Sequence, residues 1–188
     1  EMDATHKAAA DDTSNTTTGT AGKQALIAGA ELGYAIPMSD NVLIDIGINY
    51  VSGAAKLKTK SDDSTADNNT AVTLEVADLR TIYLAPTVVL SDTSSIYIKA
   101  SHTSADIGVT GDITTPGNLE GQGWAVGTRT VLENGIFIRT EAGYTEYNGI
   151  STHGKGGGTA GKDLIDVNTT FSAEPTIVHG NVSIGFRF

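Results

Sequence analysis

The chain has 188 residues, the size of one domain, and its formal net charge of -10 at pH 7 argues against nucleic acid as a partner. Cysteine is absent, which excludes disulfide bonds and thiolate metal sites. No run of apolar residues is long enough to form a transmembrane helix.

Segments in which apolar and polar residues alternate recur along the chain, and this period of two predicts an all-β fold. The first 23 residues are rich in Thr, Asp and Ala without such alternation, so we predict a loop there. In chain order, the predicted strands are 24–37, 42–58, 74–90, 95–108, 120–132, 136–150 and 176–188. Strand 74–90 alternates poorly, and we expect a β-bulge near Pro86 to change its phase.

The connections between these strands are alternately short and long. The short ones are 38–41, 91–94 and 133–135, and the long ones are 1–23, 59–73, 109–119 and 151–175. Short turns on one side and long loops on the other are typical of outer-membrane β-barrels. We therefore expect the long connections to lie outside the cell.

The last predicted strand places Val182, Ile184, Phe186 and Phe188 on one face. In a soluble protein such a terminal strand leaves a sticky edge, whereas a closed barrel has no edge and lipid covers its apolar face. We predict a single domain over residues 1–188, an eight-stranded antiparallel transmembrane β-barrel. Such barrels have an even number of strands, so we expect the first strand to be missing or truncated in this chain. A soluble sandwich or lipocalin-like barrel is the alternative fold.

Polar residues of a membrane barrel face its interior. The alternation predicts an inward charge network of Glu31, Asp45, Arg80, Lys99, Arg129, Arg139, Glu141 and Arg187, with Asp78 beside Arg80. Side chains fill an eight-stranded barrel, so these charges must pair and we expect a salt-bridge plug. Arg129 and Arg139 lie at similar heights above one turn, so we expect Glu141 to serve one cation and Glu31 or Asp45 to serve another.

Aromatic residues stand toward the strand ends, as they do in the two girdles of membrane barrels. The predicted girdle residues are Tyr34, Tyr50, Trp124, Tyr144, Phe186 and Phe188. Ordinary strand aromatics are the alternative interpretation.

Residues 123–147 read GWAVGTRTVLENGIFIRTEAGYTEY, which is a glycine-patterned strand, a short turn and a strand with an aromatic ending. The chain ends in SIGFRF. These segments resemble the small bacterial outer-membrane β-barrel family, of the outer-membrane protein A, opacity-protein and porin-like type. The resemblance covers residues 24–188 and departs from the family in the absent first strand. It implies the outer membrane of a Gram-negative bacterium and a C-terminal strand read by the outer-membrane assembly machinery.

The family includes structural proteins, adhesins, narrow pores and a few enzymes, so the resemblance leaves the function open. We predict a non-enzymatic cell-surface protein with a structural or interaction role in its long loops, without cofactor or metal. Outer-membrane lipids and lipopolysaccharide are the expected partners, together with an unidentified surface ligand or phage. The alternatives are a narrow ion or small-solute pore and an outer-leaflet lipid-modifying hydrolase. Similarity to lipid A deacylases of this barrel class makes His102, Ser104 and Glu120 the candidate catalytic residues of such a hydrolase.

Overall fold

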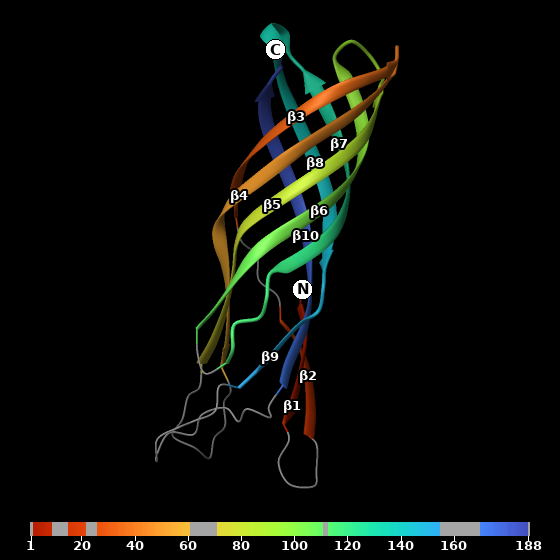
Figure 1. Cartoon of the computed structure of the whole chain (residues 1–188). Coiled ribbons are helices and arrows are strands. Elements are labelled where there is room, and N and C mark those ends of the chain that lie inside the picture. Colours follow the sequence, from red (N-terminus) through yellow and green to blue (C-terminus); the bar gives the residue numbers. More distant parts are fainter. Residues whose placement is uncertain are drawn as a thin grey trace.

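The computed structural model describes residues 2–8, 15–21, 26–60, 71–110, 113–154 and 170–187. This part of the chain is all-β, and its tilted strands form one antiparallel sheet that curls around an interior without closing (Figure 1). The strands are β1 (Met2–Ala8), β2 (Asn15–Ala21), β3 (Ala28–Ser39), β4 (Val42–Lys60), β5 (Ala71–Val89), β6 (Ser94–Thr110), β7 (Leu119–Val131), β8 (Ile136–Tyr147), β9 (Ile150–His153) and β10 (Thr170–Phe186). Among the described residues, no helix is long and apolar enough to cross a membrane.

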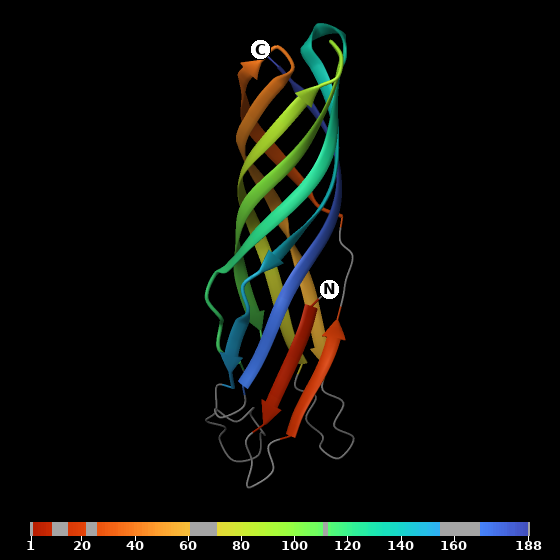
Figure 2. The same cartoon turned by 90° about the vertical axis from the view of Figure 1, so that its right-hand side faces the viewer.

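The strand order is β2-β1-β10-β8-β7-β6-β5-β4-β3, and β9 also pairs with β10. Strand β10 belongs to two regions of the sheet. Its residues 170–175 pair with β1, and 170–173 also pair with β9, whereas 176–186 pair with β8. The short strands β1, β2 and β9 thus gather at the end of the molecule opposite the C-terminus (Figure 2).

The seven predicted strands correspond to the long strands β3 to β8 and β10, with shifts at their ends. The loop prediction for the first 23 residues is wrong, because β1 and β2 lie there, and β9 occupies part of the predicted 151–175 connection. These three strands are built by pairing with β10 or with each other. Neither segment alternates apolar with polar residues, so the period of two did not reveal β1 and β2, although the threonines of β2 favour a strand.

The three predicted short connections are confirmed, and they lie at the end that carries the C-terminus (Figure 1). In the turn between β7 and β8, Asn134 and Gly135 have φ angles of 64° and 78°. An Asn-Gly pair adopts this left-handed conformation most readily, and it matches the twist of a hairpin. The backbone N–H of Leu132 donates to the oxygen of Ile136 at 2.7 Å and closes the turn.

The sheet has an open seam between β3 and the 176–186 part of β10. Among the described residues, β3 pairs with β4 alone and this part of β10 pairs with β8 alone. Both strands run from the long-connection end toward the short-turn end, so their free edges are parallel to one another (Figure 1). At the other end of the molecule, β1 lies between β10 and β2.

The two faces of the curled sheet have inverted polarity compared with a soluble protein. On β6, Ile96 and Ile98 are exposed on the outer face, whereas Ser95 and Lys99 are buried on the inner face. The other long strands repeat the outer pattern, with exposed residues that include Leu32, Ile48, Leu84, Val126, Ile138, Val182 and Ile184. Apolar side chains therefore cover the outer face of the sheet, and the buried charged side chains lie on its inner face.

Candidate functional site

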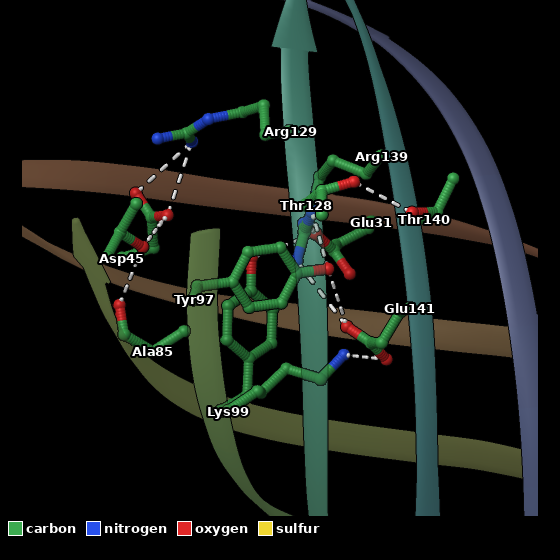
Figure 3. A network of polar contacts seen from close by, with 12 residues as sticks. Glu31, Asp45, Ala85, Tyr97, Lys99, Thr128, Arg129, Arg139, Thr140 and Glu141 are labelled. Carbon is green, nitrogen blue, oxygen red and sulfur yellow. Dashed lines mark hydrogen bonds and ion pairs between the residues drawn. The ribbon is translucent and has the colours of Figure 1, made fainter. Parts of the chain in front are cut away.

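A layer of paired charges lies between the walls of the curled sheet (Figure 3). We call it the charged layer, and its members are Glu31, Asp45, Lys99, Arg129, Arg139 and Glu141. All six were predicted to face inward, and the structure brings them together from β3, β4, β6, β7 and β8. With three carboxylates and three cations, the layer is neutral before His179 is considered.

Glu141 is the hub of the layer. Its Oε1 lies 2.5 Å from the Lys99 Nζ and 3.5 Å from Nε2 of His179. Its Oε2 accepts a hydrogen bond from the Tyr97 hydroxyl at 3.0 Å and lies 3.6 Å from Nη2 of Arg139. A carboxylate that is 8% exposed needs this many donors, because burying an ion without them would cost roughly several kcal/mol.

Arg139 links Glu141 to the opposite wall of the curled sheet. Its Nη1 pairs with Oε1 of Glu31 on β3, and its Nε donates to the Tyr97 hydroxyl at 3.3 Å. Its guanidinium also lies 4.7 Å from the ring centroid of Tyr97 and 5.9 Å from that of Tyr83. A planar guanidinium can make in-plane hydrogen bonds and stack on aromatic faces at the same time, which a lysine ammonium cannot.

Arg129 and Asp45 form the second part of the layer. Nη1 of Arg129 lies 3.2 Å from Oδ2 of Asp45, and the buried Thr87 hydroxyl donates to the same oxygen at 2.8 Å. The expectation that Glu31 or Asp45 would serve an arginine is confirmed twice over, because Glu31 serves Arg139 and Asp45 serves Arg129.

Two tyrosines complete the charged layer, and the sequence analysis did not single them out. The Tyr83 hydroxyl donates to Glu31 at 2.9 Å, and its ring centroid lies 5.1 Å from the Lys99 Nζ. A Cβ at either Gly33 or Gly47 would lie 2.6 Å from the Tyr83 hydroxyl oxygen, so only glycine leaves room for this ring. Tyr83 falls on the same alternating positions as the inward residues of its strand, and it faces glycines. These two signals could have identified it from the sequence.

The charged layer is a closed set of interactions. In the part of the chain that the structure describes, no buried side-chain nitrogen or oxygen lacks a hydrogen-bond partner. Such a set resists rearrangement, because moving one member leaves a buried charge unpaired. This chemistry suits a rigid plug that holds opposite walls of the sheet together.

The prediction that Arg80 faces inward is wrong. Its side chain is 63% exposed and its Nη2 lies 3.5 Å from Oδ2 of Asp106, on the outer face. The β-bulge of β5 lies at Asp78, which has a φ of 52°, and not near Pro86 as expected. Asp78 accepts a hydrogen bond from the Tyr50 hydroxyl at 2.7 Å, so it too is outside the layer.

Arg187 is also not part of the charged layer. It follows β10 at the short-turn end, where its backbone N–H donates to the oxygen of Gly135 at 2.9 Å and the residue is exposed. Its predicted parity was inward, but the interior ends before this position.

The candidate hydrolase residues lie on neighbouring strands near the long-connection end. Ser104 on β6 is directly opposite Glu120 on β7, and His102 is opposite Gln122. Among the described residues, no side-chain hydrogen bond joins His102, Ser104 and Glu120 to one another. The nucleophile and base contacts that such a site uses are therefore not formed in this structure.

Three of the predicted girdle aromatics share one row of the ladder on the outer face. Reading across seven strands, this row is Tyr34, Ile46, Leu84, Ala100, Trp124, Tyr144 and Val178. Tyr50 and Phe186 are exposed on the outer face as well, and Phe188 lies outside the described residues.

No family model matches the chain, no curated protein matches it, and no solved structure matches it.

Proposed function

We propose that this chain is an integral outer-membrane β-barrel protein of a Gram-negative bacterium, with a structural or interaction role at the cell surface. The observation that carries the proposal is the inverted polarity of the curled sheet. Large apolar side chains such as Leu32, Val126 and Ile184 are more than half exposed on the outer face, while buried ion pairs occupy the interior. Water disfavours this arrangement, and a lipid bilayer favours it.

On β6, β7, β8 and β10, the outer face also has a boundary where a membrane surface would lie. The row of the ladder that contains Trp124 and Tyr144 is apolar or aromatic on all seven long strands. One pleat further toward the long connections, β6, β7, β8 and β10 carry His102, Gln122, Glu146 and Thr176. The same row is still apolar on β3, β4 and β5, with Leu32, Ile48 and Ile82, because the strands are tilted and a ladder row is not level along the barrel axis. Tyrosine and tryptophan at such a boundary suit the interface between hydrocarbon and headgroups. Lipopolysaccharide and other outer-membrane lipids are accordingly the proposed partners of this surface.

The finer architecture that we propose is an eight-stranded barrel. The free edges of β3 and β10 are parallel, so one further strand running the opposite way would be antiparallel to both. In lipid, each unpaired backbone N–H or C=O group along these edges would cost roughly several kcal/mol, because hydrocarbon offers it no hydrogen-bond partner. The C-terminal half of β10 is the proposed signal for the assembly machinery.

A structural or interaction role is favoured over a pore because the charged layer is neutral and fully paired. An ion-selective pore needs charged groups that are free to bind a passing ion, and the charges of this layer already bind one another. The long connections at the other end would then carry the interactions with a surface ligand.

Membrane fractionation tests this proposal. We expect the protein to float with outer-membrane vesicles, to require detergent for extraction and to migrate faster on gels when unheated than after boiling. Recovery in the soluble fraction without detergent would contradict membrane insertion. In planar bilayers, a steady ion-selective conductance that changes with Lys99→Met or Arg129→Met would instead support the narrow pore.

A further inference from the structure

A second layer inside the curled sheet is apolar, and it lies toward the long connections. We call it the apolar layer. Its buried members are Val76, Ala105, Leu119 and Tyr147, and the partly buried Ile107 and Ile177 pack against them. They come from β5, β6, β7, β8 and β10, which are five neighbouring strands of the sheet, so the layer lines the interior along this arc.

The two layers are stacked along the strands. On β6, Ala105 is six residues beyond Lys99, and on β8, Tyr147 is six residues beyond Glu141. Six residues of strand measure about 20 Å, and the tilt of the strands shortens the axial distance. Small hydroxyl side chains lie between the layers, where the side-chain oxygens of Thr81 and Thr103 are 2.8 Å apart.

The loop side of the apolar layer is held by a crossing segment. The segment that precedes β7 forms a bridge between Ile113, which is 5% exposed, and Gly154. The backbone N–H of Thr114 donates to the oxygen of His153 at 2.8 Å, and the hydroxyls of Thr114 and Thr152 are 2.9 Å apart. These bonds tie the chain before Leu119 to the chain that follows Tyr147, so two members of the layer are fixed relative to each other.

We infer that the apolar layer, and not the charged layer, is the barrier to ions and water through this protein. This inference rests on the proposed membrane insertion. Carboxylate oxygens of the charged layer keep lone pairs that water can use, so a void beside the intact ion pairs can fill with water. Apolar walls offer water no partners, and a constriction lined by them stays dry and blocks ions. The charged layer then stabilises the barrel, and the apolar layer seals it.

Planar-bilayer conductance of matched variants tests the inference. Leu119→Asn wets the apolar layer with a smaller side chain of the same branching, and Val76→Thr does so isosterically. We expect one or both to raise the conductance at least tenfold over the parent protein. Tyr147→Phe keeps the layer apolar and should leave the conductance at the parent level. Glu141→Gln, in the charged layer, should also leave it there while lowering the midpoint of unfolding.

The faster migration of unheated protein on gels is measured for every variant, so that insertion and sealing are read separately. A variant that no longer shows the gel shift has lost the barrel and is replaced by the other apolar-layer variant. Conductance from Glu141→Gln but not from inserted Leu119→Asn or Val76→Thr would overturn the inference and leave the proposed function standing. Baseline conductance from both inserted apolar-layer variants would overturn it as well. A parent protein that fails to insert would overturn the proposed function and, with it, this inference.

Discussion

Arg129 and Arg139 are direct partners in the β7–β8 ladder, yet their guanidinium groups bind different acids from the far wall of the sheet. Arg129 binds Asp45 on β4, and Arg139 binds Glu31 on β3. Two adjacent cations would repel, and the separate acids give each a local countercharge. The same ion pairs connect β7 and β8 to β3 and β4. They therefore relieve the repulsion and also hold opposite walls of the sheet together.

Replacement of Glu141 by alanine should destabilise the protein far more than replacement of Glu146. Glu141→Ala leaves Lys99 and Arg139 without their shared partner, at a cost of about 3–5 kcal/mol in unfolding free energy. Glu146 lies on the exposed outer face of the same strand, so Glu146→Ala is the matched control. Equilibrium unfolding in detergent or lipid measures both, and equal losses would show that the charged layer does not hold the walls together.

A methyl group at Gly47 should cost stability because the Tyr83 ring occupies its place. A Cβ there would lie 2.6 Å from the Tyr83 hydroxyl oxygen and 2.6 Å from the backbone oxygen of Leu32. We expect Gly47→Ala to lower the unfolding free energy by about 1–3 kcal/mol, the usual cost of overpacking. Gly180→Ala is the control, since its Cβ would meet no atom within 4 Å. An unchanged unfolding midpoint for Gly47→Ala would mean that Tyr83 does not pack there.

Arginine on the outer face of β7 should report the depth of each position in the bilayer. Val126 lies on the apolar side of Trp124, and Gln122 lies on its polar side. In a bilayer, Val126→Arg should cost about 2–4 kcal/mol if it is near the midplane, and Gln122→Arg about 0–1 kcal/mol near the interface. Unfolding from lipid vesicles gives the two values. A larger cost for Gln122→Arg would place the membrane elsewhere on the sheet.

Cysteine pairs can establish whether a strand occupies the open seam. The natural chain has no cysteine, so each introduced pair is unambiguous. Leu32→Cys should not form a disulfide with cysteine at Val178, Val182 or Ile184, because an intervening strand separates the edges by about 9.6 Å, twice the strand spacing. Leu32→Cys with Ile48→Cys is the positive control, since these residues are ladder partners. Ready oxidation across the seam in membranes would show that β3 and β10 pair directly.

Much of this fold is determined locally, and the sequence alone therefore predicts it. Alternation of apolar and polar residues sets the inner and outer face of each long strand, because successive side chains point to opposite sides. The same local rule identified six members of the charged layer, and Asn134-Gly135 identified a hairpin turn. Their functional meaning, membrane insertion with a structural role, stays a prediction.

Other features depend on the tertiary structure. Strands β1, β2 and β9 form by pairing with other strands. The partner of β1, strand β10, lies far from it in the sequence, and β1 and β2 have no amphipathic pattern. The bulge at Asp78, which turns Arg80 outward, occurs at a residue that no local rule marks. Which acid meets which cation depends on strand register and on the curl of the sheet, as for Asp45 and Arg129, 84 residues apart. Local periodicity determines the face of the sheet on which a side chain lies. Its partner is determined only when the folded sheet brings distant strands within contact distance.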